Sequence, residues 1–252
     1  MSGVLNEGGL LAKGAVDIVA AGRYDVRVLY LDNHLLAVEK PANMPVQADS
    51  SGDMDMLNAL KDYIARKFDK PGKAYLGLVH RLDRPVGGAM VLARTSKAAA
   101  RLSKQFSDHK VKKIYLAVTK GEQTGEVEME DWLLKDERTG MVRAVDPGVA
   151  GAKRATLRSK AIASIDGATL REVELFSGRP HQIRVQHASR GWPVWGDARY
   201  DQGRPGCQIA LWSARLTIEH PVARTPVTIV SRPPDAGIWT SFSRYLEDYY
   251  GK

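Results

Sequence analysis

Residues 75–93 read YLGLVHRLDRPVGGAMVLA, and this stretch decides the fold around the candidate site. The apolar runs at its two ends predict buried strands, and the Pro-Val-Gly-Gly segment between them predicts a sharp turn. The turn places one carboxylate, Asp83, between the cations of Arg81 and Arg84. Rigid strands would hold such a carboxylate toward a ligand, and the flanking cations would keep it ionised. A surface ion pair, or an aspartate that only caps the turn, explains the same pattern.

Outward from this stretch, the spacing of apolar residues predicts a mixture of strands and helices. The expected strands are 26–30, 35–38, 75–79, 89–93, 114–118, 173–175, 209–218 and 227–230, with a long hairpin loop at 134–153. The expected helices are 57–68, capped by Asp53 or Asp55, then 96–106, capped by Thr95 or Ser96, then 181–190 and 238–249. Many hairpin-joined strands with few helices indicate an α+β fold, with a mixed, largely antiparallel sheet flanked by helices and loops.

The composition is that of a soluble globular protein. The chain has 252 residues, of which 44% are hydrophobic and 26% charged. Its only cysteine, Cys207, excludes an internal disulfide and a cysteine-based zinc site, and favours a reducing compartment. We see no signal peptide or membrane span, so a cytoplasmic protein is expected. Residues 1–25 are expected to form a Gly-rich, loosely structured lead or a short helix.

The charge of the chain favours a polyanionic partner. The formal net charge is +8 and the sequence pI is about 9.5. A basic run directly follows the Asp83 segment; its members are Arg94, Lys97, Arg101, Lys104, Lys110, Lys112 and Lys113, with Asp108 as the one acid among them. Such a run is often just a solvated face. Here its position favours a surface that tracks phosphates, with salt-sensitive binding.

Four ordered segments now carry a resemblance. They are 32–46 (DNHLLAVEKPANMPV), 80–83 (HRLD), 113–117 (KIYLA), and 178–185 with 196–200 (GRPHQIRV and GDARY). Together they resemble the RluA-type pseudouridine synthases. The resemblance implies a pseudouridine synthase fold with a central catalytic cleft, formed by residues 26–252 as a stand-alone catalytic domain without the S4 domain that the family often carries. It also implies an enzyme that needs no cofactor or metal and isomerises uridines in a stem-loop of ribosomal or transfer RNA. The resemblance leaves the oligomeric state open, and we expect a monomer.

The chain departs from the family pattern at three places. Val86-Gly87-Gly88 stands where the family usually has Thr-Ser-Gly, so hydroxyls that could bond the loop or a phosphate are lost. Asn43 replaces a usual glycine, which is tolerable because asparagine also accepts left-handed backbone geometry. Gln186 stands where a histidine is common. None of these changes touches the residues to which the resemblance gives a catalytic role.

The resemblance implies three catalytic residues. Asp83 is the nucleophile or base, either attacking the sugar or abstracting a sugar proton to give a glycal. Arg184 forms a salt bridge with Asp83, and a planar guanidinium can hold a carboxylate bidentately. Tyr115 stacks under the target ring, with a further role in proton transfer open to its hydroxyl. From the residues alone, Arg184 is an ordinary helix-face arginine and Tyr115 a core tyrosine.

Further residues are expected to bind the substrate. Arg81 lies two residues before Asp83, so on an extended segment both face one side, and its guanidinium can fill the gap left by a flipped base. A phosphate contact or an ion pair is the alternative for Arg81. Leu211 is expected on the other face of the base, although a strand leucine is usually core. The remaining expected substrate contacts are His80, Arg84, Arg179, His181 and Lys113.

Two other classes of function compete with an RNA uridine isomerase. The first is a non-catalytic RNA-binding protein or RNA-folding factor on the same scaffold, against which the presence of Asp83, Tyr115 and Arg184 argues. The second is a hydrolase of glycosidic bonds. Such enzymes usually need a pair of carboxylates, and no second one is evident near Asp83 in the sequence.

Overall fold

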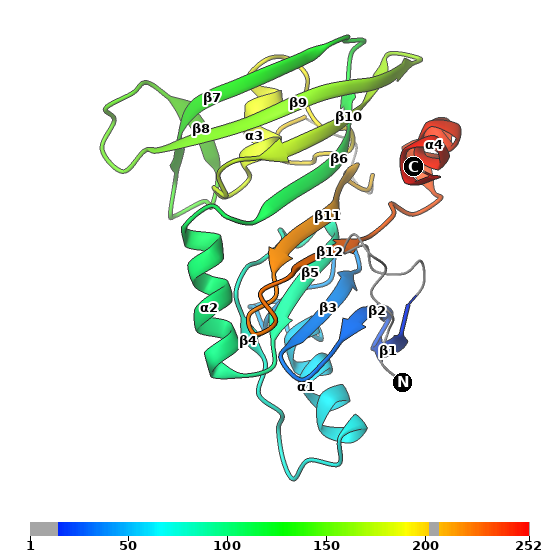
Figure 1. Ribbon diagram of the computed structural model, residues 1–252. Coiled ribbons are helices and arrows are strands. Elements are labelled where there is room, and N and C mark those ends of the chain that lie inside the picture. The colour runs from blue at the N-terminus through cyan, green and yellow to red at the C-terminus, as the bar shows by residue number, and fades with distance from the viewer. Residues whose placement is uncertain (1–14, 202–206, 252) are drawn as a thin grey trace. The chain divides into compact units, whose positions relative to one another are not determined.

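The computed structural model describes residues 15–201 and 207–251. The chain divides into two compact units. Unit 1 comprises Met1–Lys112 and Ser213–Ser231, and unit 2 comprises Lys113–Trp212 and Arg232–Lys252. Each unit contains antiparallel strand pairs and helices, so the expected α+β class with a largely antiparallel sheet is confirmed (Figure 1).

The sheet of unit 1 places its strands in the order β1-β2-β3-β5-β11, with β12 paired to β11 and the short β4 paired to β5. Pairing is antiparallel from β1 to β5 and between β11 and β12. The strands are β1 (Asp17–Ala21), β2 (Tyr24–Leu31), β3 (Leu35–Lys40), β4 (Gly77–Leu78), β5 (Gly87–Ala93), β11 (Leu211–Glu219) and β12 (Pro226–Val230). The helices are α1 (Met56–Lys67) and α2 (Ser96–Ser107). β4 and β5 therefore flank the Asp83 segment, but β4 has only two half-buried residues, so the buried strand expected at 75–79 is shorter and less buried than predicted.

The core of unit 1 surrounds β5, in which all seven residues are buried. Val91 packs with Leu102 of α2 and Leu216 of β11 in one cluster. Because side chains alternate across a strand, Met90 and Leu92 face the opposite side, where they are also fully buried. A strand buried on both faces gives the segment that follows Asp83 a rigid anchor.

In unit 1, the side chain of the residue just before each helix caps its first turn. Asp55 Oδ1 accepts the amide hydrogen of Asn58 at 2.9 Å, and Thr95 Oγ1 accepts that of Ala98 at 3.1 Å. Of the two caps considered for each helix, Asp55 and Thr95 are thus the ones used. Asp53 has a different partner, described below.

The expected lead at residues 1–25 needs correction within the described part. Residues 17–21 form β1, which pairs with β2 through a turn at Gly22, whose φ is +63°. Val19 and Ala21 alternate with exposed neighbours and are buried. The alternating pattern is only five residues long and follows a Gly-rich start, so propensity alone did not reveal the strand; pairing with β2 stabilises it. Residues 1–14 lie outside the described part.

The sheet of unit 2 has the order β6-β10-β9-β7-β8, and the pairs of β10 with β6 and β9 and of β7 with β8 and β9 are antiparallel. Its strands are β6 (Lys112–Lys120), β7 (Glu126–Lys135), β8 (Val142–Val145), β9 (Lys153–Ile165) and β10 (Ala168–Leu175). The loop expected at 134–153 therefore contains β8, because the segment pairs back on β7. Three helical segments follow, namely α3 (Gln182–Ala188), the 3₁₀ helix η1 (Gly237–Phe242) and α4 (Ser243–Gly251). The C-terminal helix thus begins with a 3₁₀ segment.

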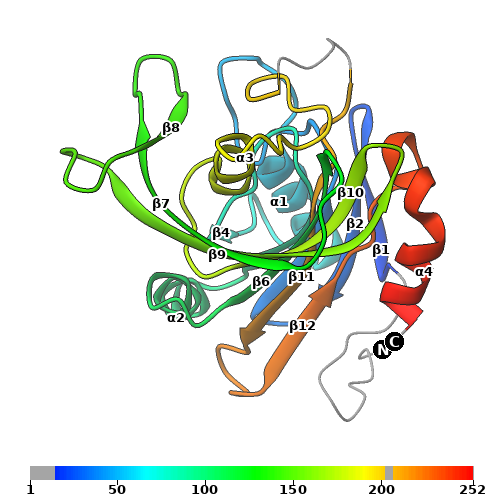
Figure 2. The same ribbon diagram turned by 90° about the horizontal axis from the view of Figure 1, so that it is seen from above.

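A buried polar network in unit 2 fixes α3, which packs against β7 and β8 inside the curve of the sheet (Figure 2). His187 of α3 has no exposed surface; its Nδ1 lies 2.8 Å from the Ile183 carbonyl and its Nε2 lies 3.0 Å from Ser159 Oγ. Nδ1 therefore donates and Nε2 accepts, which is the neutral imidazole. Arg171 Nη1 donates to the same Ser159 Oγ at 3.3 Å. Burial is the main cause that lowers the pKa of His187 to about 4.

We expect the unfolding free energy to fall as the pH drops from 6.5 to 4. In this window His187 binds a proton in the unfolded chain, with a pKa of 6.5, but not in the folded chain, with a pKa of about 4. The full shift corresponds to about 3 kcal/mol. Urea unfolding at a series of pH values measures it. The variant His187→Gln carries no titrating group there and should lose this part of the slope; equal slopes in the two proteins would contradict the prediction.

Candidate active site

The Asp83 loop is held by buried apolar anchors on both sides. Leu82 and Val86 are 7% and 2% exposed, whereas Asp83 between them is half-buried. The amide of Val86 donates to the Asp83 carbonyl at 3.0 Å and closes a tight turn. The buried side chains of Leu82 and Val86 therefore hold the backbone of the loop, while the Asp83 carboxylate stays partly accessible, as a nucleophile or base requires.

A fully buried lysine binds the carbonyls of this loop. Lys40, the last residue of β3, donates from Nζ to the carbonyl oxygens of Pro41, Arg84 and Val86 at 2.9, 2.9 and 2.8 Å. Burial lowers the pKa of Lys40 to about 7, while the nearby Asp83 carboxylate raises it. Three acceptors match the three donors of an ammonium, so the contacts favour the charged form. Lys40 lies in the matched Lys-Pro segment, but no sequence pattern indicates that it reaches the carbonyls of the Asp83 loop 44 and 46 residues further on.

Gly88 is the one position of Val86-Gly87-Gly88 that agrees with the family pattern, and its surroundings require glycine. Its φ is +116°, and a Cβ there would lie 2.3 Å from the carbonyl oxygen and 2.6 Å from the nitrogen of Ser213 on β11. Only glycine fits this approach, and this is the position where the family pattern also ends in glycine. Val86 fills a buried apolar position, and its carbonyl accepts from Lys40. The loop thus has backbone restraints that need no hydroxyl at 86 or 87.

Gly88→Ala is expected to lower the unfolding free energy by about 2–5 kcal/mol, because the methyl group meets backbone that cannot move aside. Gly72→Ala is the matched control, since Gly72 also has a positive φ of +80° but nothing lies within 4 Å of its Cβ position. The control should lose only the cost of the backbone geometry, about 1–2 kcal/mol. Denaturant unfolding of both variants measures the difference, and equal losses would contradict the clash.

The residues around Asp83 differ in their contacts. Arg81 is exposed. His80 accepts the amide hydrogen of Val91 on Nε2 at 3.0 Å, and its ring stacks on Phe106 at 4.6 Å between centroids. These contacts brace the loop against β5 and α2. A substrate contact for Arg81 and His80 stays a prediction.

Arg184 forms a buried ion pair that the sequence analysis missed. Its Nε and Nη2 donate to Oδ2 and Oδ1 of Asp197, both at 2.7 Å, and the side chains are 4% and 0% exposed. Asp197 Oδ1 also accepts the amide hydrogens of Arg199 and Tyr200. The bidentate geometry fixes the plane of the guanidinium. The Gly-Asp of the matched segment 196–200 was the available signal, but it did not name a partner.

The other expected residues of unit 2 lie on β6, β11 and the segment before α3. Tyr115 is half-buried on β6, opposite Val173 of β10, and Leu211 is 4% exposed on β11. Lys113 Nζ donates to the Ser177 carbonyl at 3.1 Å, and burial, with the charge of Arg179, lowers its pKa. Lys113 therefore holds the turn that leads into the Arg179–His181 segment.

The first and last residues of segment 179–181 both bind neighbouring residues. Arg179 donates from Nε to the Arg154 carbonyl at 3.0 Å. His181 has a left-handed backbone, with φ of 51°, and its Nδ1 lies 2.7 Å from the hydroxyl of Tyr200, which also accepts the Val142 amide. Burial raises the pKa of Tyr200. Tyr200 is a further residue of the site that the sequence analysis left without a role, although it lay within a matched segment.

The three expected catalytic residues belong to different units. Asp83 is in unit 1, whereas Tyr115 and Arg184 are in unit 2. The pairing of Arg184 with Asp83 stays a prediction.

Three members of the basic run already bind within unit 1. Arg94 lies over the Phe68 ring at 4.2 Å and donates to the Asp32 carbonyl, and Arg101 donates to the Pro221 carbonyl at 2.6 Å. Lys104 pairs with Asp108 at 3.1 Å. A phosphate-tracking role of the run stays a prediction.

In 15–201 and 207–251, no group of three or more His, Cys, Asp or Glu side chains is arranged to hold a metal ion. Over the same ranges, no helix has the length and apolar character needed to cross a membrane.

Comparisons with known proteins agree on one family. Residues 34–189 match the family described as RNA pseudouridylate synthase. Ribosomal large subunit pseudouridine synthase D of Zymomonas mobilis is 31% identical over 83% of this chain and 69% of its own length. Ribosomal large subunit pseudouridine synthase C of Vibrio vulnificus is 31% identical over 80% and 64%, and tRNA pseudouridine synthase C of Pectobacterium carotovorum is 28% identical over 86% and 62%. The chain thus spans about two thirds of the length of these relatives.

A solved structure supports the fold. Human RNA Pseudouridylate Synthase Domain Containing 4 is similar with a TM-score of 0.67 at 20% identity, covering 88% of this chain and 91% of that one. The resemblance found in four sequence segments is confirmed by the family match and by these relatives. The chain belongs to the RNA pseudouridylate synthase family.

Proposed function

We propose that this chain is an RNA pseudouridine synthase that isomerises uridines in a structured ribosomal or transfer RNA. The observation that carries the proposal is the Asp83 loop, in which a half-exposed carboxylate sits between buried anchors on a backbone bound by Lys40. Rigid placement of one carboxylate suits a reaction that needs a single nucleophile or base rather than a hydrolytic pair. The names of the relatives support both classes of RNA as substrates.

The reaction breaks the bond from N1 of uracil to C1′ of the ribose and forms a bond from C5 to C1′. The target base first leaves its stack, since no side chain reaches these atoms in a paired helix. Asp83 then attacks the sugar or removes a sugar proton. After the ring has turned, C5 joins C1′ as the bond from Asp83 to C1′ breaks, or the abstracted proton returns to the sugar. C5 then loses its hydrogen to solvent, and N1 takes up a proton from solvent. Atoms balance without a cofactor or an oxidant.

The other residues take roles that follow from the family resemblance. Arg184 pairs with the Asp83 carboxylate and directs it, Tyr115 stacks against the ring, and Leu211 packs on its other face. Arg81 fills the gap left by the base. Residues 26–252 act together as one catalytic domain, as a monomer in the cytoplasm.

Release of tritium from RNA labelled at C5 of uridine tests the proposal, because only a reaction that replaces the C5 hydrogen gives tritiated water. Ribosomal and transfer RNA that lack the modification serve as substrates, and sequencing of carbodiimide-treated RNA locates the product. RNA binding without any release would instead support a non-catalytic RNA-binding protein. Free uracil would indicate a glycosidic hydrolase.

A further inference from the structure

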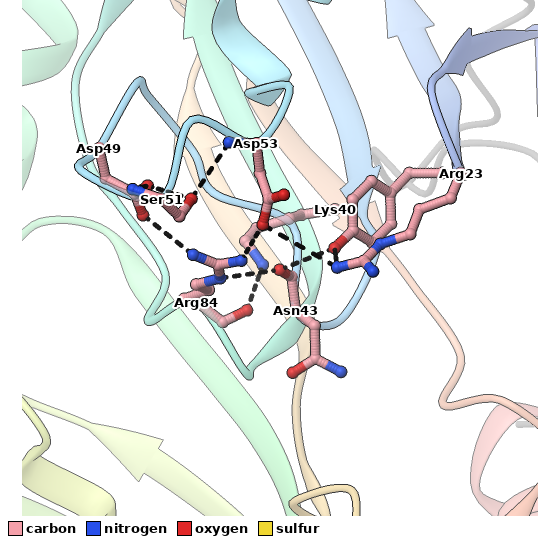
Figure 3. Close-up of polar contacts among 8 residues, drawn as sticks. Arg23, Lys40, Asn43, Asp49, Ser51, Asp53 and Arg84 are labelled. Atoms are coloured by element: carbon pink, nitrogen blue, oxygen red, sulfur yellow. Dashed lines mark hydrogen bonds and ion pairs between the residues drawn. The ribbon is translucent and has the colours of Figure 1, made fainter.

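Arg84, the residue after Asp83, directs its side chain at the segment 43–53 of its own unit (Figure 3). Its Nε donates to the carbonyl of Asn43 at 3.1 Å, its Nη1 to Asp49 Oδ2 at 3.2 Å, and its Nη2 to Asp53 Oδ2. Each of the three guanidinium nitrogens thus has an acceptor in this segment. Arg84 was expected to bind substrate. In the structure its guanidinium binds segment 43–53.

The main chain of Arg84 is held as well. Its carbonyl accepts from Lys40 Nζ at 2.9 Å. The residue adjacent to Asp83 is therefore bound at its backbone by β3 and at its side chain by segment 43–53. Because Asp83 is its direct neighbour in the chain, a shift of Arg84 displaces the Asp83 backbone.

Hydrogen bonds within segment 43–53, and one from Tyr24, hold this segment in place. The Asn43 carbonyl also accepts from the Tyr24 hydroxyl at 3.0 Å, and Asn43 has a φ of 66°. Ser51 donates its amide to Asp49 Oδ1 at 2.9 Å, and the Asp53 amide donates to Ser51 Oγ at 3.2 Å. The Asp49 carboxylate is thus held by a short turn, and Asp53 lies directly after that turn.

We propose that Asp49 and Asp53 form a carboxylate clamp on Arg84, and that these three are positioning residues that hold the Asp83 loop for catalysis. The inference rests on the proposed function, since it concerns how well Asp83 is placed for that reaction. A misplacement of about 1 Å can cost about 10²-fold in rate. The clamp therefore acts on the chemical step rather than on RNA affinity.

Charge argues against Arg84 as a phosphate contact. Its guanidinium and that of Arg23, which lies 3.9 Å from Asp53, carry two positive charges, and Asp49 and Asp53 carry two negative ones. The sum of this group is zero, so it offers an RNA phosphate little attraction. The side chains of Arg84, Asp49 and Asp53 are 38%, 40% and 39% exposed, so removing these contacts costs little global stability and the variants should fold.

The test compares the double variant Asp49→Asn/Asp53→Asn with the control Asp25→Asn, which removes a carboxylate from an exposed position on β2 of the same unit. Single-turnover pseudouridine formation at saturating RNA gives the rate of the chemical step, and filter binding gives the RNA affinity. We expect the double variant to react about 10- to 100-fold more slowly while it binds RNA equally well or more tightly, because it has lost negative charge. The control should keep its rate.

Two further measurements separate the clamp from its alternatives. Hydrogen exchange at the Val86 amide, which bonds to the Asp83 carbonyl, should be faster in the double variant than in the control, whether or not any RNA is a substrate. If Arg84 instead binds phosphate, Arg84→Gln should weaken RNA binding and reduce the salt slope by about one. A double variant with the rate and exchange of the control overturns the clamp. A wild-type protein inactive on every RNA overturns the proposed function instead.

Discussion

Asp83→Asn is expected to lower pseudouridine formation by about 10⁴-fold or more while the protein stays folded and binds RNA. An amide has nearly the shape of the carboxylate but neither its negative charge nor its basicity, so it cannot attack the sugar or remove a proton from it. Removal of a nucleophile in other enzymes gives losses of this size. Release of tritium from C5-labelled RNA and filter binding of the same RNA measure the two quantities.

Asp25→Asn supplies the control for charge, since it changes the net charge of unit 1 by the same amount. The Asp83 variant should also lower the pKa of Lys40, because the Asp83 carboxylate raises it in the wild type. A variant that keeps activity within about tenfold of the wild type would remove Asp83 as nucleophile and base. The matched segment around Asp83 would then be a structural loop, which is the alternative that the sequence of the turn left open.

The sequence predicted the elements that depend on local pattern. The apolar run after Asp83 forms β5, only two residues of the run before it form β4, and the caps of both helices in unit 1 were among those proposed. Patterns shorter or more polar than these were harder to interpret. Residues 17–21 form a strand of only five residues. In the first part of β9, the buried Ala155, Leu157 and Ser159 alternate with polar side chains, so no apolar run marked this strand.

Contacts between residues far apart in the chain could not be predicted from the sequence. Lys40 reaches carbonyls 44 and 46 residues away, and nothing in its strand pattern marks a lysine as buried. Asp53 and Asp55 were equivalent candidates for one helix cap. The fold assigns the cap to Asp55 and turns Asp53 toward Arg84, because only the tertiary structure places an arginine beside it.

Asp197 shows the same limit in unit 2. The family resemblance assigned Arg184 a partner in Asp83, but a second carboxylate 13 residues further along the chain takes two of its donors. An arginine held in this way has a fixed plane before any substrate arrives. Preorganisation of this kind suits a residue that must direct a carboxylate during the reaction.

Breaking the Arg184–Asp197 pair is the second change with a large expected effect. Both side chains are almost wholly buried, so Asp197→Asn or Arg184→Met alone leaves one charge without this partner. We expect each single variant to lose about 3–5 kcal/mol of unfolding free energy. Asparagine is chosen at 197 because its Oδ1 can still accept the amides of Arg199 and Tyr200. Denaturant unfolding measures the loss.

The double variant Arg184→Met/Asp197→Asn separates folding from catalysis. It removes both charges, so it should recover most of the stability that either single variant loses. It should still form pseudouridine at least about 100-fold more slowly than the wild type, because it lacks the guanidinium that we propose directs Asp83. A stable double variant with wild-type activity would show that Arg184 serves the fold of unit 2 alone. If stability returns while activity does not, the lost activity of this variant comes from impaired catalysis and not from unfolding.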